Sequence, residues 1–164
     1  MAETGDYIVV HLVDTRKVGD RFERKRLSWP LHITLVPWFV ASDMQAVSGL
    51  LEQVAARHEP FEVRVGQIDH FGADNEIPVN VIAGPQPLRR VHSDVLQVLQ
   101  DTHATLRSVR WTGDNYIPHI TRHEATDHYK NDGDMVRVAD FHVVKLTDDN
   151  WCEVDAVYRL KGDV

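Results

Sequence analysis

A histidine and a threonine separated by one isoleucine occur twice in the sequence, as His32-Ile33-Thr34 and as His119-Ile120-Thr121. In an extended strand, residues i and i+2 point to one side and the residue between them points to the other. Each copy therefore presents an imidazole beside a hydroxyl, while its isoleucine faces a core. Two such pairs facing each other would supply an acid, a base and two hydroxyl donors, which are the groups needed for transesterification or hydrolysis at phosphorus.

The elements that must position these residues can be predicted from apolar periodicity. The first copy lies in a strand over 31–36 that ends at Pro37-Trp38-Phe39, and the second lies in a strand over 116–121. Ser42 and Gln45 form a capping-box signature before a helix over 43–57, and Pro87 suits the first residue of a second helix that runs to about 106. Further strands are predicted over 7–13, 61–68, 78–83, 135–146 and 151–160.

Part of this order of elements repeats along the chain. Val63-Arg64-Val65 followed by Ile68 matches Val136-Arg137-Val138 followed by Phe141, and each segment continues into an acidic turn and a strand. The two copies of the His-Ile-Thr motif thus belong to two similar halves that have diverged.

Composition indicates one globular domain. The chain has 164 residues, of which 43% are hydrophobic and 26% charged, and no apolar run approaches the roughly 20 residues of a membrane helix. The first six residues lack the basic region of a secretory signal, and a single cysteine, Cys152, excludes an internal disulfide. We therefore expect a cytoplasmic protein that does not bind membranes.

Charge restricts the partners that the protein could bind. A net charge of −7 argues against a protein that coats long nucleic acid, but it is compatible with small nucleotides and RNA ends. Positive charge is concentrated just before the first motif. This basic stretch is either a solvated hairpin or an arm over the site that attracts phosphate; it consists of Arg16, Lys17, Arg21, Arg24, Lys25 and Arg26.

The motif neighbourhoods resemble the 2H phosphoesterase superfamily, which includes bacterial 2′-5′ RNA ligase-like proteins and 2′,3′-cyclic nucleotide phosphodiesterases. The resemblance is carried by the segments WPLHITLVPW at 29–38 and YIPHIT at 116–121, whose histidines are 87 residues apart (119 − 32). Arg122 departs from the family pattern, which has an apolar residue at that position. Either the strand ends there, or Arg122 turns toward the ligand and binds phosphate.

The resemblance implies an α+β fold in which residues 1–164 form a single domain of two pseudo-symmetric lobes. Two antiparallel sheets with outer helices would face each other across a central cleft. The implied activity is that of a metal-independent phosphoesterase without a cofactor, with His32 and His119 catalytic and Thr34 and Thr121 binding phosphate. The expected substrate is a 2′,3′-cyclic phosphate end of RNA or of a nucleotide, or a 2′-5′ linkage that is cleaved or joined, and the expected state is a monomer.

Opening a cyclic phosphate needs one neutral imidazole and one imidazolium, and histidine supplies both forms near neutral pH. For hydrolysis the sequence analysis favours His119 as the base and His32 as the acid. Tyr116 and Arg122 could contact the substrate, and Trp38 and Phe39 could stack on a nucleobase. Each of these four residues could equally be structural.

Other functions are compatible with parts of the sequence. His119, His123 and His128 are close together in the chain, but their spacing suits a metal only on a helix, which Pro118 disfavours. No nucleophile elbow accompanies Cys152. The alternatives that stay open are a non-catalytic RNA- or nucleotide-binding module that uses the same cleft, and a hydrolase of cyclic oligonucleotide signals.

Overall fold

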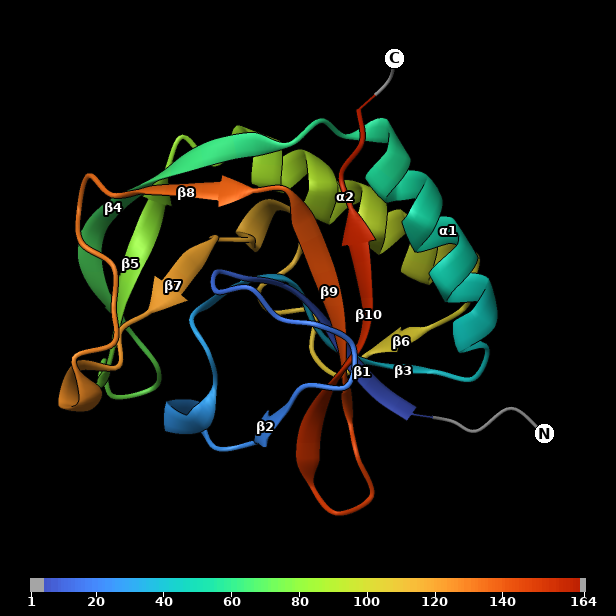
Figure 1. Ribbon diagram of the computed structural model, residues 1–164, viewed down its shortest axis with the longest axis horizontal. Helices are drawn as coiled ribbons and strands as arrows, with labels where there is room; N and C mark the ends of the chain where they lie inside the picture. The colour runs from blue at the N-terminus through green and yellow to red at the C-terminus, as the bar shows by residue number, and fades with distance from the viewer. Residues whose placement is uncertain (1–4, 163–164) are drawn as a thin grey trace.

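Ten strands and two α-helices form the fold of residues 5–162, the part of the chain that this computed structural model describes, the side chain of Leu27 excepted (Figure 1). Four of the six N-terminal residues considered for a signal sequence therefore lie outside the described residues. The strands are β1 Gly5–Leu12, β2 Arg21–Glu23, β3 His32–Ala41, β4 Phe61–Phe71, β5 Ile77–Ala83, β6 Thr105–Leu106, β7 His119–Thr121, β8 Met135–Val138, β9 Asp140–Leu146 and β10 Trp151–Arg159. The helices are α1 Met44–Arg57 and α2 Gln86–Asp101, and short 3₁₀ turns occupy Arg26–Ser28, Gly113–Asn115 and Glu124–Thr126.

The strands follow one antiparallel path in the order β2-β10-β9-β1-β3-β7-β5-β4-β8, with β6 added beside β3. β3 and β7 meet in the middle of this path through a single paired position, Ile33 opposite Ile120. The strands thus form two groups on either side of that pair, as Figure 1 shows for β4, β5, β7 and β8 on the left. The α+β class is confirmed, but the two expected sheets are continuous with each other through the two motif strands.

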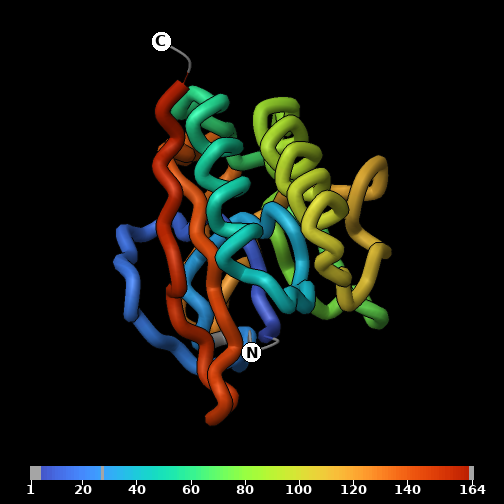
Figure 2. Tube along the Cα trace, turned by 90° about the vertical axis from the view of Figure 1, so that its right-hand side faces the viewer, coloured from blue at the N-terminus to red at the C-terminus, as the bar shows by residue number. Residues whose placement is uncertain are grey.

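Both helices cover the same side of the sheet and lie next to each other (Figure 2). α1 packs against β10 and α2 packs against β3. The larger apolar core lies under them and contains both motif isoleucines, Ile33 and Ile120, which are almost completely buried. The alternation predicted for the two motifs is therefore confirmed. Neither helix of the described chain is long and apolar enough to cross a membrane.

The helix boundaries lie close to the predicted ones, apart from the end of α2. Asp43, and not Ser42, caps α1, because its Oδ1 accepts a hydrogen bond from the Ala46 amide at 3.1 Å. α2 begins at Gln86, one residue before the predicted start, so Pro87 is its second residue. α2 ends at Asp101 instead of near 106, because the chain takes a left-handed conformation at His103 (φ 58°) and then enters β6.

The strand that carries the first motif is longer than predicted. It continues through Pro37 to Ala41. Val36 and Phe39, three residues apart on β3, pair with Val9 and Tyr7, which are only two residues apart on β1, so β3 has one extra residue here. This β-bulge accommodates a proline that cannot donate to a regular ladder. The second motif strand is shorter than predicted, since a 3₁₀ turn and Pro118 precede it.

The predicted strand over 135–146 is in fact two strands with different partners. β8 pairs with β4 in one group, whereas β9 pairs with β1 and β10 in the other. The chain therefore crosses from one group to the other between Val138 and Asp140.

Candidate active site

The two motifs lie side by side on neighbouring antiparallel strands. Extending the Ile33–Ile120 register by one residue in each direction places His32 opposite Thr121, and Thr34 opposite His119. Directly opposed side chains in an antiparallel pair have Cβ atoms about 4.5–5.5 Å apart. The four polar side chains therefore form a crossed quartet on the face opposite the isoleucines, with a histidine at each end of one diagonal.

Backbone hydrogen bonds determine which ring nitrogen of each histidine is available. Nδ1 of His32 lies 2.9 Å from the carbonyl oxygen of Pro30, and Nδ1 of His119 lies 2.7 Å from that of Ile117. A carbonyl can only accept, so Nδ1 carries a proton in both rings. Nε2 is then the nitrogen that remains for a substrate, as a base when the ring is neutral and as an acid when it is protonated.

Each catalytic candidate packs against an aromatic ring. The ring centroids of Trp29 and His32 are 4.7 Å apart, and those of Phe71 and His119 are 4.8 Å apart. Burial lowers the pKa of His32 from 6.5 to about 4, helped by the nearby charges of His119 and His123, and burial also lowers the pKa of His119. His32 is accordingly neutral near pH 7 in the free protein.

A cleft with two compartments surrounds the quartet. The larger cavity, of about 600 Å³, extends past His119 toward β4 and Trp111, and the smaller cavity, of about 320 Å³, extends past His32 toward Trp29 and Trp38. Thr34, His119 and Thr121 border both cavities. The quartet is therefore placed between two spaces, each of which can hold part of a substrate.

The charge of the cleft is opposite to that of the whole protein. Among the described residues that line the two cavities there is no aspartate or glutamate, although the chain has a net charge of −7. Three arginines line the cavities: Arg24 in the smaller, Arg110 in the larger and Arg26 in both. This distribution favours an anionic ligand.

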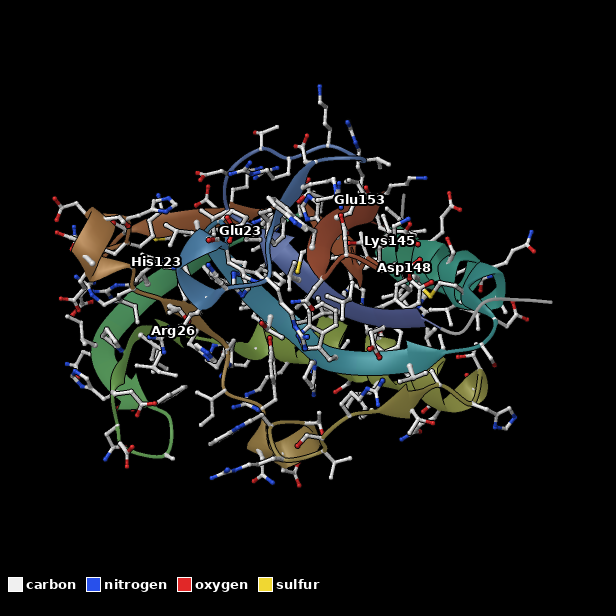
Figure 3. The ribbon with its side chains drawn as sticks, turned by 90° about the horizontal axis from the view of Figure 1, so that it is seen from below. Glu23, Arg26, His123, Lys145, Asp148 and Glu153 are labelled. Atoms are coloured by element: carbon white, nitrogen blue, oxygen red, sulfur yellow. The ribbon has the colours of Figure 1, made fainter. Side chains whose placement is uncertain are left out.

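Some residues of the basic stretch line the cleft, and others form ion pairs away from it. Arg24 and Arg26 reach the cleft from the arm between β2 and β3, and Figure 3 shows Arg26 on the same side of the molecule as His123. Arg21 instead pairs with Asp149 at 2.9 Å, and Lys25 pairs with Glu23 at 3.5 Å. Part of the stretch is thus a solvated hairpin and part is an arm at the site.

The larger cavity contains an aromatic pair that the sequence analysis did not identify. The rings of Phe71 and Trp111 are parallel, with centroids 6.1 Å apart, and the guanidinium of Arg110 lies 5.2 Å from the Trp111 ring. Trp111 is 49% exposed, which leaves ring surface available for a planar ligand. The partners are forty residues apart in sequence (111 − 71), so no local pattern revealed them.

Tyr116 contacts the backbone of the first motif and also lines the larger cavity. Its hydroxyl donates to the backbone oxygen of Thr34 at 2.7 Å, and its ring stacks on His92 at 4.0 Å. His92 Nδ1 in turn donates to the Leu35 oxygen at 2.5 Å, and its Nε2 accepts from the Gly113 amide at 3.0 Å. Burial raises the pKa of Tyr116, so the hydroxyl stays protonated as a donor.

The two aromatic candidates after the first motif have different environments. Trp38 lines the smaller cavity, with the Arg24 guanidinium 5.9 Å from its ring. Phe39 is completely buried and packs on Tyr7 at 5.9 Å, so it is not available for stacking on a base. Trp38 therefore faces the cleft, whereas Phe39 faces the core.

Arg122 does not turn toward the cleft. Its guanidinium donates to the side-chain oxygen of Asn80 and to the backbone oxygen of Lys130, both at 2.7 Å, and lies 4.2 Å from the Tyr129 ring. Arg122 is two positions from Ile120, so alternation directs it away from Thr121. This arrangement does not support the alternative in which Arg122 binds phosphate.

One further cluster has the composition of a metal centre. In the described chain, the only grouping of three potential ligands is His11, Asp140 and His142. His11 Nδ1 already hydrogen-bonds the Asp140 backbone oxygen at 2.8 Å, and His142 Nδ1 accepts from the Leu12 amide at 3.3 Å. Both Nδ1 atoms thus already have partners within the protein, and we assign no metal to this cluster. His119, His123 and His128 do not converge on one point within residues 5–162.

Residues 9–141, well over half of the chain, match the sequence model of the 2′-5′ RNA ligase superfamily. The chain belongs to this superfamily. This agrees with the resemblance to the 2H phosphoesterases noted from the motifs. No curated protein matches the chain.

Solved structures share the fold of this superfamily member at low sequence identity. TT0787 of Thermus thermophilus is 19% identical over 82% of this chain and 80% of its own, with a TM-score of 0.55. Escherichia coli LigT complexed with 3′-AMP is 13% identical over 96% of this chain and 99% of its own, with a TM-score of 0.59. A structure described as a phosphoesterase is 12% identical over 96% of this chain and 99% of its own, with a TM-score of 0.61. These likenesses show the fold alone.

Proposed function

We propose that this protein is a metal-independent phosphodiesterase that hydrolyses a phosphodiester attached to ribose, with His32 and His119 as its acid and base. The observation that carries the proposal is the crossed quartet, in which both rings have the same tautomer and both Nε2 atoms remain for the substrate. A general acid and a general base on opposite sides of phosphorus are what in-line displacement requires. Thr34 and Thr121 lie between the histidines and donate hydrogen bonds to the non-bridging oxygens.

Burial lowers the pKa of both rings, but the charges of His119 and His123 lower that of His32 further, which favours His32 as the base and reverses the assignment favoured by the sequence. Nε2 of neutral His32 removes a proton from water as its oxygen bonds to phosphorus. The P–O bond to the ribose breaks, and Nε2–H of protonated His119 supplies the proton to the departing oxygen. The pKa of His32 is lowered by the charges of His119 and His123 in addition to burial, whereas for His119 the lowering cause is burial. An anionic phosphate bound between the two rings favours the protonated form of both, and His119, which lacks the additional lowering by neighbouring charges, is then the ring that carries the proton.

The proposed substrate is a 2′,3′-cyclic phosphate at an RNA end or on a nucleotide. A cleft lined by Arg24, Arg26 and Arg110 and by no carboxylate among its described residues suits a phosphate, and the Phe71–Trp111 pair suits a base. The structural likeness to LigT complexed with 3′-AMP, which carries a base, a ribose and a phosphate, is compatible with this substrate.

The two compartments favour one second candidate. A phosphodiester with a nucleoside on each side, such as a 2′-5′ linkage, would occupy both cavities, whereas a cyclic mononucleotide would occupy one. Comparing a 2′-5′ dinucleotide with 2′,3′-cyclic AMP therefore distinguishes the candidates by kcat/KM.

The test is incubation with EDTA and a panel of 2′,3′-cyclic nucleotides, cyclic-phosphate RNA ends, 2′-5′ dinucleotides and cyclic oligonucleotides, with products analysed by mass. We expect turnover that EDTA does not reduce. His32→Ala and His119→Ala should each lose about 10²–10⁴-fold in kcat with little change in nucleotide affinity. Nucleotide binding without turnover of any panel member would instead identify a binding module.

A further inference from the structure

A third histidine lies beside the quartet on the second motif strand. His119, Thr121 and His123 are at alternate positions, and the extended backbone continues past β7 through a bridge in which His123 and His128 exchange amide–carbonyl hydrogen bonds of 2.9 and 3.0 Å. Alternation therefore places the ring of His123 on the same side as those of His119 and Thr121.

The register places His123 next to His32. With His32 opposite Thr121, the residues two positions away on the facing strand, His119 and His123, are its two diagonal neighbours. Diagonal neighbours in an antiparallel pair are within reach of long or aromatic side chains. His123 and His32 line the same smaller cavity, and both His119 and His123 act electrostatically on His32.

His123 has no counterpart in the first motif. The equivalent position there is Val36 (123 − 87), which is completely buried in the apolar core. His123 is also buried, with 1% of its surface exposed, but it borders a cavity that contains Arg24, Arg26 and His32 and no carboxylate among the described residues. An imidazole in that position can donate to an anion.

From these contacts we infer that His123 is a third catalytic imidazole, which donates a hydrogen bond to a non-bridging oxygen of the substrate phosphoryl group beside His32. The inference rests on the proposed function and extends it. No bond changes at His123, because its role is to hold the phosphoryl oxygen where negative charge grows during the displacement. The smaller cavity thereby holds a phosphoryl oxygen beside His32, with Arg26, which lines both cavities, as a neighbouring cation.

Several groups lie beside His123. His32, Arg24 and Arg26 share its cavity, and the ring of His128 packs edge-on against it with centroids 5.8 Å apart. His128 Nε2 lies 3.6 Å from an Asp14 carboxylate oxygen and is outside the lining of both cavities. His128 is thus a matched control, since it contacts His123 but not the cleft.

The test is titration of the full-length protein with inorganic phosphate, followed by NMR of the histidine ring nitrogens, together with turnover measurements. In the wild type, the ring signals of His123 should move with those of His32 and His119. His123→Leu should weaken phosphate binding and lower kcat/KM by about 10- to 100-fold, and His123→Asn, which keeps a donor, should recover part of that loss. His128→Leu should bind phosphate as the wild type does.

Three results would overturn the inference: wild-type His123 signals that saturating phosphate does not move, His123→Leu and His123→Asn that bind phosphate within twofold of wild type, or an equal loss in His128→Leu. The first of these decides the matter even if His123→Leu does not fold. Phosphate binding is read without turnover, so the two proposals fail separately. A protein that hydrolyses no panel substrate but binds phosphate through His123 contradicts the proposed function, while the contact of His123 with phosphate stands.

Discussion

Replacing His32 by glutamine should make the protein less sensitive to acid. The pKa of His32 is lowered from 6.5 to about 4 by burial and by the charges of His119 and His123. At pH 5 the unfolded chain therefore takes up a proton at this histidine, whereas the folded protein keeps the ring neutral. Stability is lost as the pH falls from about 6.5 to about 4, and it is not lost further at this residue below that range.

The size of the effect follows from the two pKa values. Each factor of ten in proton affinity corresponds to about 1.4 kcal/mol, and between pH 7.5 and pH 5 the unfolded state gains about 1.5 such factors over the folded state. His32 alone should therefore lower the free energy of unfolding by about 2 kcal/mol over this interval. Glutamine does not titrate, so this part of the loss should disappear in His32→Gln.

The assay is urea denaturation of the wild type and His32→Gln at pH 7.5 and at pH 5. Comparing the two pH differences removes the direct effect of the substitution on packing against Trp29. Thr34→Val, which alters the same cleft without removing a titratable group, should show the wild-type pH dependence. Equal losses of stability in the wild type and His32→Gln would refute the account of a desolvated His32.

Three more predictions concern the support and the lining of the cleft. Tyr116→Phe removes the hydrogen bond to the Thr34 oxygen and should lower the free energy of unfolding by about 1–3 kcal/mol in urea melts, with a fall in kcat. Trp111→Ala should raise KM for nucleotides by about tenfold with little change in kcat, because a stacked base contributes about 1–3 kcal/mol; an unchanged KM would show that the base binds elsewhere. Arg122→Met should destabilise the protein by about 3 kcal/mol, since it leaves the side-chain oxygen of buried Asn80 without its donor, while the phosphate affinity of the folded variant should match the wild type. A folded, stable Arg122→Met that binds phosphate poorly would contradict the structural role.

Several features follow from the sequence because they are local. Alternation along a strand places Ile33 and Ile120 in the core and the neighbouring histidines and threonines on the other face, and this depends only on backbone geometry. The two helices were predictable for the same reason, since each has an apolar stripe at helical spacing. The duplication of the motif was sufficient to indicate the superfamily.

The ends of these elements were less predictable, because they depend on partners. Pro37 would end an isolated strand, but a bulge opposite β1 carries β3 on to Ala41. The sequence predicted Ser42 as the cap of α1, but Asp43 is the cap in the structure. The backbone leading into the helix decides which side chain reaches the Ala46 amide.

The sequence by itself therefore determined the chemistry of the site: two imidazoles and two hydroxyls, each pair on one face of a strand. Only the tertiary structure decided their relation, because the β3–β7 register that sets His32 opposite Thr121 joins two motifs that are distant in the chain. The same register brings His123 beside His32, and chain packing brings Arg26 and the Phe71–Trp111 pair to the cleft. Such contacts come from the closing of long loops, which no local periodicity encodes.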